Sequence, residues 1–385
     1  MRILHTVELY HPSVGGAQEV VRQLSERMAA AGHEVTVATS KLPERKVDTL
    51  NGVRIVEFDV SGSAVRGYQG ADVDKYKQFV VDGDFDVVMN YAAQQWATDL
   101  FSEVIDHVRG RKVLVPCGFS ALYAPSYSEY FARMPELLEK YDATVYMSER
   151  YRDIAFAREH GVRNIHVIPN AADEREFGSL LSKDEQARIR EKYGISGRLV
   201  LSIGTHTGSK GHRESMLAFL LAPFVHGTLA IIGDNGSCRK SCERRATRAN
   251  RWGRLLGKKI LLLDVEREDT VRLLKAADAF LFLSNIEASP LVLFEAAAAG
   301  TPFVAGRAGN SEEIAHWTGG GMTVRSPARS DGYVRPSVAL AAMKLARLLL
   351  GPGLRSRMGE RGPLAWSERF TWERATSRYL ELYEG

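Results

Sequence analysis

Two glutamates that stand eight residues apart give the strongest chemical signal in this chain. Glu287 and Glu295 both follow the run 279–283, which is apolar without alternation and therefore predicts a buried parallel strand. Residues 290–299 predict the next helix, with Ser289 as its N-cap and a proline in its first turn. Glu287 is then expected in a loop at the carboxyl end of a strand, and Glu295 one to two turns into the helix.

The expected position of this pair favours a ligand that carries both phosphate and hydroxyl groups. Open α/β sheets bind ligands at the carboxyl ends of their strands, and a helix start attracts anions. A carboxylate one turn further along can accept hydrogen bonds from a sugar diol. The alternative is two solvated glutamates beside a helix start. We favour a binding site, because both acids flank a largely apolar run at a ligand-binding edge.

A second loop with phosphate-binding character spans residues 204–211 and follows the strand predicted at residues 199–203. Its glycines, Gly204 among them, let the backbone approach phosphate oxygens, and Lys210 supplies a mobile positive charge. The spacing is not that of a Walker A loop, where the lysine precedes Ser or Thr. An ordinary strand-to-helix turn is the alternative. On the same sheet edge as Glu287, however, this loop predicts a diphosphate site.

The equivalent first turn near the N-terminus contains Gly15 and Gly16 and lacks the G-x-G-x-x-G spacing, so it does not predict a dinucleotide site. It is either a plain glycine turn or a flexible segment that touches donor phosphate or acceptor. Cys117 ends another predicted strand. Nothing around it indicates a nucleophile, and we interpret it as a small residue that lines the site.

Apolar runs alternate with amphipathic stretches in both halves of the chain, which predicts parallel sheets covered by helices on both faces. The fold class is therefore α/β, with two tandem Rossmann-like, doubly wound domains that face a cleft and a C-terminal helix that returns to the first domain. The predicted parts are a first doubly wound domain, a linker, a second doubly wound domain and a crossover helix, at residues 1–172, 173–197, 198–361 and 362–385.

The bulk properties exclude several classes of protein. The 385 residues are 45% hydrophobic and 25% charged with a net charge of +4, which is too small to indicate nucleic acid. The most apolar stretch, Val338–Leu350, is interrupted by Lys344 and Arg347, so no membrane span is expected. Three cysteines favour a reducing cytoplasm. Cys238 and Cys242 share a helical face but form only half a zinc site, so neither a metal nor a cofactor is expected.

The segment 239–259 is rich in cations and contains one acid, Glu243. Its cations form a stripe at helical spacing: Arg244, Arg248, Arg251, Arg254 and Lys258. We favour a solvated helix face. The alternative is docking to an anionic acceptor or lipid, which would place the protein at the inner face of a membrane. Only Trp252 is available for stacking on bases, so nucleic acid is not an expected partner.

These motifs together resemble glycosyltransferase family 4, whose members are retaining enzymes of the GT-B fold. The resemblance is strongest over residues 284–300, which match the E-x7-E block, and over residues 309–314, the Gly-rich turn after it. Weaker matches are Gly15-Gly16 with the helix that follows, residues 168–173, and Gly204 with Lys210-Gly211.

The resemblance assigns roles to individual residues. Glu287 is the expected catalytic residue, beside the transferred sugar. Lys210 holds the donor diphosphate, Glu295 holds the ribose hydroxyls, and the helix amides near Leu291 and Val292 receive phosphate. The expected donor site is Gly16, Gly204, His206, Lys210, Ser289, Leu291, Val292 and Glu295. Gly15 and Cys117 lie on the acceptor or sugar side. No metal is needed in this scheme, since Lys210 and helix ends take the diphosphate charge.

Three positions depart from the family pattern. Thr205 stands where an arginine is frequent in the phosphate loop, so His206 is expected to replace that positive partner. Cys117 stands where many members have a histidine that contacts the donor sugar. The Asn-Gly pair that is common at the end of the first domain is Asn170-Ala171 here.

The leading function is transfer of a hexose from a nucleotide diphosphate sugar to a hydroxyl of a surface glycan, a lipid-linked acceptor or a small molecule. Two alternatives stay open. One is another GT-B enzyme such as an epimerase, which the E-x7-E block disfavours. The other is an inactive nucleotide-sugar-binding scaffold, which the missing arginine keeps open and the retained lysine and glutamates disfavour.

Overall fold

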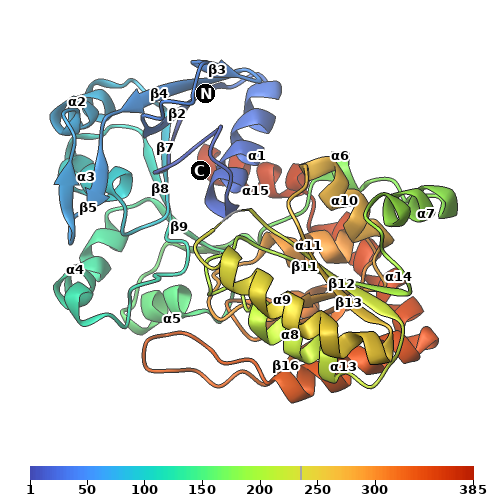
Figure 1. Cartoon of the computed structure of the whole chain (residues 1–385). Coiled ribbons are helices and arrows are strands. Elements are labelled where there is room, and N and C mark those ends of the chain that lie inside the picture. The colour runs from blue at the N-terminus through green and yellow to red at the C-terminus, as the bar shows by residue number, and fades with distance from the viewer. Residues whose placement is uncertain (235) are drawn as a thin grey trace. The chain divides into compact units, whose positions relative to one another are not determined.

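The computed structural model describes residues 1–234 and 236–385, which form two compact units (Figure 1). Unit 1 comprises Met1–Asn170 together with Trp372–Gly385, and unit 2 comprises Ala171–Thr371. The segment predicted as a linker is part of unit 2, where it forms α6 (Glu174–Phe177) and α7 (Lys183–Lys192).

Unit 1 is built on an eight-stranded sheet with the order β10-β9-β8-β7-β1-β2-β4-β3. Neighbouring strands are parallel except β3 and β4. The strands are β1 (Arg2–Thr6), β2 (Glu34–Ser40), β3 (Thr49–Leu50), β4 (Val53–Phe58), β7 (Val87–Tyr91), β8 (Arg111–Val115), β9 (Ala143–Tyr146) and β10 (Ile165–Val167). The helices are α1 (Gly16–Ala30), α2 (Val73–Asp82), α3 (Trp96–Val104), α4 (Ser128–Glu139), α5 (Arg152–Glu159) and α15 (Trp372–Glu384).

The central strands of unit 1 are buried on both faces, as the apolar runs predict for a parallel sheet between two layers of helices. The predicted parallel sheet with helices on both faces is confirmed for this unit. A small antiparallel hairpin, β5 (Ser61–Ser63) with β6 (Gly67–Gln69), forms a separate two-stranded sheet and was not predicted. Helix α2 was not predicted either.

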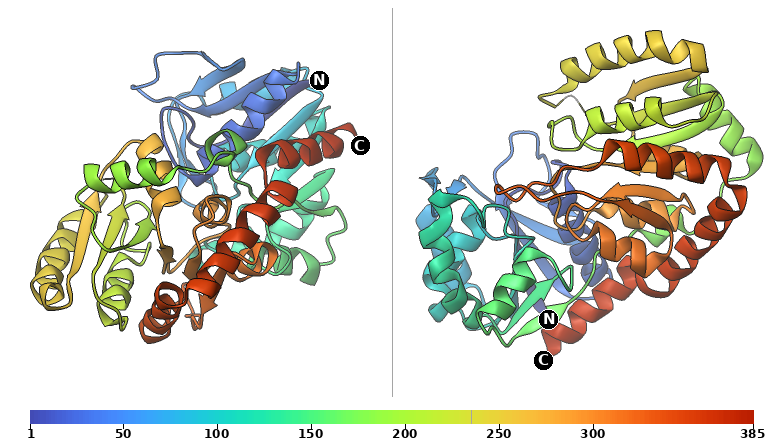
Figure 2. Two further views of the ribbon diagram at one scale, coloured as in Figure 1. Left: turned by 90° about the vertical axis from the view of Figure 1, so that its right-hand side faces the viewer. Right: turned by 90° about the horizontal axis from the view of Figure 1, so that it is seen from below.

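The C-terminal helix α15 completes unit 1, which confirms the predicted return of the chain to its first domain. The two termini lie near each other (Figure 2). His5, in the middle of β1, is buried and forms hydrogen bonds with Tyr383 of α15 at 3.0 Å and with Ser25 of α1 at 2.7 Å. Burial lowers the pKa of His5 to about 3, so the ring is neutral and acts as a fixed polar link inside the core.

Unit 2 has a six-stranded parallel sheet with the order β13-β12-β11-β14-β15-β16. The strands are β11 (Arg198–Ile203), β12 (Gly227–Ile232), β13 (Lys258–Leu263), β14 (Ala279–Phe282), β15 (Phe303–Gly306) and β16 (Gly321–Val324). Besides α6 and α7, the longer helices are α8 (His212–Leu221), α9 (Arg239–Gly253), α10 (Arg267–Ala276), α11 (Leu291–Ala298), α12 (Ser311–Thr318), α13 (Val338–Leu350) and α14 (Pro352–Arg369). The two sheets confirm the predicted pair of Rossmann-like domains.

The chain passes between the units twice, and the residues of unit 2 at these two passages are bonded to each other. Ala172 donates its backbone N–H to Phe370 O at 3.0 Å, and Trp366 donates its indole N–H to Ala172 O at 3.0 Å. The predicted last helix, which was expected to be continuous from residue 362, is therefore divided here into α14 and α15. Among the described residues, no helix is long and apolar enough to span a bilayer.

Candidate active site

The strand order of unit 2 changes direction between β11 and β14. The chain leaves β11 toward β12 on one side, whereas β14 lies on the other side of β11. Loops that leave two such strands in opposite directions open a crevice at the carboxyl edge of the sheet, where α/β proteins bind ligands. The two loops predicted from the sequence to form one site, which follow β11 and β14, are therefore neighbours in the structure.

The backbones of these two loops touch where each loop leaves its strand. Gly211 has φ +68°, and a Cβ built on it would lie 1.8 Å from the carbonyl oxygen of Leu283. Only glycine fits there, for both conformational and steric reasons. Asn285 donates its backbone N–H to Ser209 O at 2.7 Å, and the Ser284 hydroxyl donates to the same oxygen at 3.2 Å. The site is thus positioned by rigid main-chain contacts.

Lys210 and Glu287, one from each loop, form an ion pair with Nζ and Oε1 2.8 Å apart. The Lys210 side chain is 30% exposed and that of Glu287 is 12% exposed. An ammonium group has three hydrogens to donate, and the carboxylate accepts one of them. A partly exposed amine that retains donors beside a helix start is suited to bind an anionic group of a ligand.

Two helices begin at this edge without a side-chain cap. Helix α8 starts after Gly211, and α11 starts after Pro290. The prediction of Ser289 as N-cap was wrong, because Pro290 still has extended dihedrals and the helical ones begin at Leu291. Leu291 and Val292 are therefore the first two helical residues, as their assigned role requires. Helix starts carry partial positive charge, so both ends favour phosphate.

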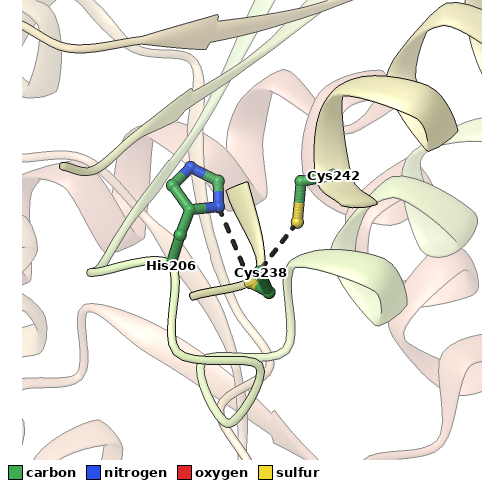
Figure 3. Close-up of side chains that lie close together, drawn as sticks. All are labelled: His206, Cys238 and Cys242. Carbon is green, nitrogen blue, oxygen red and sulfur yellow. Dashed lines mark hydrogen bonds between the residues drawn. The ribbon is translucent and has the colours of Figure 1, made fainter. Parts of the chain in front are cut away.

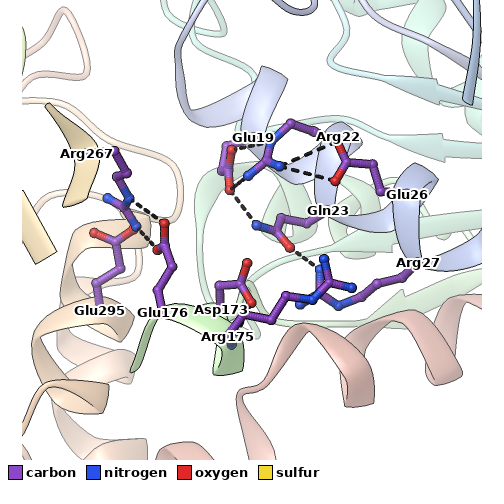
Figure 4. A network of polar contacts seen from close by, with 10 residues as sticks. All are labelled: Glu19, Arg22, Gln23, Glu26, Arg27, Asp173, Arg175, Glu176, Arg267 and Glu295. Atoms are coloured by element: carbon purple, nitrogen blue, oxygen red, sulfur yellow. Dashed lines mark hydrogen bonds and ion pairs between the residues drawn. The ribbon is translucent and has the colours of Figure 1, made fainter. Parts of the chain in front are cut away.

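Glu295 is almost completely buried, and Arg267 of α10 compensates its charge. Arg267 Nη2 donates to Glu295 Oε1 at 2.6 Å and Nε donates to Glu176 Oε1 at 3.0 Å (Figure 4). Among the described residues, nothing hydrogen-bonds to Glu295 Oε2. A buried carboxylate oxygen that lacks a donor is energetically costly, and a ligand hydroxyl that donated to it would remove that cost.

His206 occupies a different place from the one its expected role implies. Its side chain is fully buried, with Nδ1 3.8 Å from Cys238 Sγ and Nε2 3.5 Å from Arg239 Nη1. Burial, and after it the positive charge of Arg239, lower the pKa of His206, so the ring is neutral at neutral pH. In this conformation His206 is neither exposed to a ligand nor protonated. Gly204, in the same loop, accepts a hydrogen bond from His212 at its carbonyl oxygen.

Unit 1 has its own switch point, between β1 and β7, and the predicted glycine loop lies there. Gly15 is the N-cap of α1 without a side-chain hydrogen bond, and Gly16 is its first residue. A Cβ on Gly16 would meet no atom within 4 Å, so open space adjoins this helix start. Further along α1, partly exposed Arg22 forms ion pairs with Glu19 and with buried Glu26 (Figure 4).

Cys117 lies in a strained segment at the end of β8. Cys117, Gly118 and Phe119 all have positive φ, at 59°, 91° and 42°. The backbone N–H of Gly118 donates to Asp153 Oδ2 at 2.8 Å. Burial raises the pKa of Asp153 to about 6. Strain of this kind concentrates at functional sites, so the loop that carries Cys117 stays a candidate for contact with substrate.

Sequence reasoning missed several residues of these regions. Arg267 and Glu176 are 91 positions apart and are brought together only by the fold. Arg239 was given no role beyond beginning the cation-rich segment, but it donates to Gly233 O at 3.1 Å beside His206. Asp153 is an ordinary helix residue in the sequence, and nothing there indicates that it holds the Cys117 loop.

Comparison with known proteins gives the same division of the chain. The family model described as Glycosyltransferase Family 4 matches residues 14–176, and the model described as Glycosyl transferases group 1 matches residues 185–364. Together they span both units. The chain belongs to the family 4 glycosyltransferases. The expected family is therefore confirmed, and the protein is a transferase of the GT-B fold.

Alignments with two relatives cover almost the full length of this glycosyltransferase. N-acetyl-alpha-D-glucosaminyl L-malate synthase of Bacillus anthracis is 23% identical, over 97% of this chain and 94% of the relative. D-inositol 3-phosphate glycosyltransferase of Xylanimonas cellulosilytica is 25% identical, over 100% and 95%. Sucrose-phosphate synthase from Thermosynechococcus elongatus and Anabaena HepE in complex with UDP each superpose with a TM-score of 0.77, at 18% and 17% identity. These structures cover 100% of this chain, and 98% and 100% of theirs.

We predict that Lys210→Ala weakens binding of a nucleoside diphosphate about ten- to a hundred-fold without unfolding the protein. A charge-assisted contact to phosphate contributes about 1.5–3 kcal/mol. Isothermal titration with the diphosphate that gives the largest shift in a thermal screen measures the loss. Lys183→Ala, at an exposed position of α7, is the matched control and should bind normally. Equal affinity of Lys210→Ala and Lys183→Ala would remove Lys210 from the site.

Proposed function

We propose that this glycosyltransferase transfers a hexose from a nucleotide diphosphate sugar to a hydroxyl acceptor with retention of anomeric configuration. One observation carries the proposal. Lys210 and Glu287 meet between two uncapped helix starts, and Glu295 offers a buried, unpaired carboxylate oxygen nearby on α11. This arrangement provides one group for each part of such a donor: cations and amides for the diphosphate, and acceptors for the sugar hydroxyls.

Most of the donor contacts in this proposal come from unit 2, and Gly16 of unit 1 adds one more. The ribose hydroxyls donate to Glu295 Oε2, and the diphosphate lies between Lys210 and the first amides of α11. Glu287 accepts from hydroxyls of the transferred hexose. Solved structures of Anabaena HepE contain UDP and UDP-glucose, which supports a uridine donor as the first to be tested.

The acceptor carries a hydroxyl on a surface glycan, a lipid-linked molecule or a small molecule. The names of the two relatives above specify malate and inositol 3-phosphate, both small hydroxyl compounds. They support the small-molecule class without selecting one compound. Gly15 and the strained Cys117 loop of unit 1 are the proposed contacts on the acceptor or sugar side.

The most direct test is donor-dependent release of nucleotide by the purified protein. A thermal-shift screen of nucleotide sugars selects the donor, and candidate acceptors are then added. Accelerated release in the presence of an acceptor is expected. Binding of a donor without release, for all acceptor classes, would favour the inactive scaffold.

Catalysis requires no metal ion in this proposal, because Lys210 and the starts of α8 and α11 stabilise the departing diphosphate. Addition of magnesium or manganese to the purified protein is therefore expected to leave turnover unchanged. Assays with and without these ions check this point. Turnover that appears only when magnesium or manganese is added, and that zinc does not support, would contradict the scheme.

Retention follows from attack on the face from which the nucleotide leaves. The bond from the acceptor oxygen to the anomeric carbon forms as the bond to the diphosphate oxygen breaks, and the acceptor proton passes to that diphosphate oxygen. The alternative, a covalent intermediate, needs a carboxylate on the opposite face. Glu287 is 2.8 Å from Lys210, the proposed diphosphate ligand, which favours a position beside the sugar rather than beneath its anomeric carbon.

Glu287→Gln should lower kcat about 10²–10³-fold, because a neutral amide no longer stabilises positive charge on the sugar in the transition state. The product of both proteins is expected to retain its configuration, as nuclear magnetic resonance would show. Glu268→Gln, on the exposed start of α10, serves as the control with normal turnover. A glycosyl adduct on Glu287 in mass spectra, or an inverted product, would overturn the mechanism.

We also propose that the protein is cytoplasmic and contacts an anionic membrane surface through the end of α9. Here the large side chains Trp252 and Leu255 are 75% and 85% exposed. The exposed cations Arg244, Arg248 and Arg251 lie on the same helix, and exposed Arg254 directly follows it. Cations that attract anionic headgroups, next to apolar side chains that can insert, are the combination that interfacial helices use.

Flotation with vesicles tests this surface. Binding to vesicles that contain phosphatidylserine is expected to exceed binding to neutral phosphatidylcholine vesicles and to fall as salt is raised. The double variant Arg248→Glu/Arg251→Glu should lose the binding, whereas Arg188→Glu on α7 should keep it. Equal flotation of both variants would show that α9 is a solvated helix and nothing more.

A further inference from the structure

Three side chains that ligate soft metals lie together at the carboxyl edge of unit 2. His206 comes from the loop after β11, Cys238 is the N-cap of α9, and Cys242 lies one turn into that helix (Figure 3). Their ligand atoms all lie within 4.8 Å of one another. The spacing in the sequence pairs the two cysteines but does not indicate His206 as a third ligand, because it lies 32 positions before Cys238.

Two of the three separations between the ligand atoms are close to those of neighbouring corners of a tetrahedron around one ion, and the third, between Cys242 Sγ and His206, is at most 4.8 Å. Cys238 Sγ is 3.6 Å from Cys242 Sγ and 3.8 Å from His206 Nδ1. With Zn–S of about 2.3 Å and Zn–N of about 2.0–2.1 Å, tetrahedral geometry requires S···S of about 3.8 Å and S···N of about 3.6 Å. Both separations agree within about 0.2 Å, so small side-chain rotations would close the site.

We propose that His206, Cys238 and Cys242 bind one zinc ion, with water as the fourth ligand. Two thiolates and a neutral imidazole balance the charge of Zn²⁺, which suits a position where His206 and Cys242 are buried. The start of α9 favours thiolates through its partial positive charge. Half-buried Cys238 provides access from solvent. The absence of oxygen ligands excludes magnesium and calcium as the preferred ions.

The bound ion would fasten two loops that already touch through their backbones. Cys238 donates its N–H to His206 O at 2.8 Å. A Cβ on Gly236 would lie 2.4 Å from His206 O, and one on Gly233 would lie 2.1 Å from Gly204 O. Zinc would therefore hold the loop of Gly204 and Lys210 to the start of α9. Its role is to order the proposed diphosphate loop, and it takes no part in the transfer.

Metal binding also changes the partners of the His206 ring. Nε2 of His206 faces Nη1 of Arg239, which can only donate, so the ring proton is assigned to Nδ1, toward Cys238. Ligation through Nδ1 would place the proton on Nε2 instead, and Arg239 would keep its contacts with Glu243 Oε1 and Gly233 O.

Metal titration of the reduced, full-length protein tests the proposal without any assay of turnover, so its result is independent of the proposed function. One equivalent of zinc is expected to bind with Kd below about 1 µM. Cobalt, used as a spectroscopic substitute, should give thiolate charge-transfer bands and the intense visible bands of a tetrahedral site. A phosphine reductant keeps the cysteines as thiols without competing as a thiol ligand.

Loss of an outer-shell partner weakens metal binding about 10–100-fold. Cys242→Ser and Cys238→Ser each remove a direct ligand, so each should weaken zinc binding by more than that. Cys117→Ser, the third cysteine and part of unit 1, is the matched control and should keep the full stoichiometry and affinity. Circular dichroism confirms that each variant is folded. Absence of charge-transfer bands in the wild-type protein, or equal metal binding by Cys117→Ser and both other variants, would overturn the site.

Discussion

The ion pair of Lys210 and Glu287 depends on the crossing between β11 and β14. The two residues are 77 positions apart, and they meet because the sheet places β14 beside β11 after the chain has built β12 and β13 on the other side. The close approach of Gly211 to the carbonyl oxygen of Leu283 fixes the position of one loop against the other. Both helix starts and both side chains then take their places from a contact that only glycine permits.

This pair contributes more to organisation than to stability. Exposed ion pairs add at most about 1 kcal/mol to folding, and Lys210 is only partly buried. The carboxylate does, however, hold a long and flexible lysine in one direction before any ligand arrives, which lowers the entropic cost of binding. In the proposed donor complex, the diphosphate would compete with Glu287 for the ammonium group. The release of Glu287 leaves that carboxylate available to the sugar, so binding of the two halves of a donor would be coupled.

Much of this architecture could be predicted from short-range patterns. The apolar run of β14 and the proline before α11 are visible in the sequence. They predict Glu287 in the loop between the two elements and Glu295 in the helix, and both residues are found there. Ser289 was misplaced by one residue as a cap, because proline is compatible with both the N-cap and the first helical position. Arg267, which neutralises Glu295, could not be found, since a single exposed-looking arginine carries no sign of its distant partner.

The same limit explains His206. As a histidine in a loop with Lys210, it suggested a phosphate ligand, and its burial against Cys238 depends on how the segments after β11 and β12 pack. Loop conformation is decided by backbone contacts between segments, which residue types reveal only at special glycines. The strained dihedral angles of Cys117 and Phe119 are hidden for the same reason, because neither residue type favours positive φ.

The buried link from His5 to Tyr383 has a consequence for the order in which the molecule is made. Unit 1 begins with β1, which precedes all of unit 2 in the chain, but its core is closed by α15, which follows unit 2. All of unit 2 is contiguous and is translated before that helix exists. Of the two units, the one that is started first is therefore completed last. The surface of α1 that packs against α15 stays uncovered while unit 2 is synthesised.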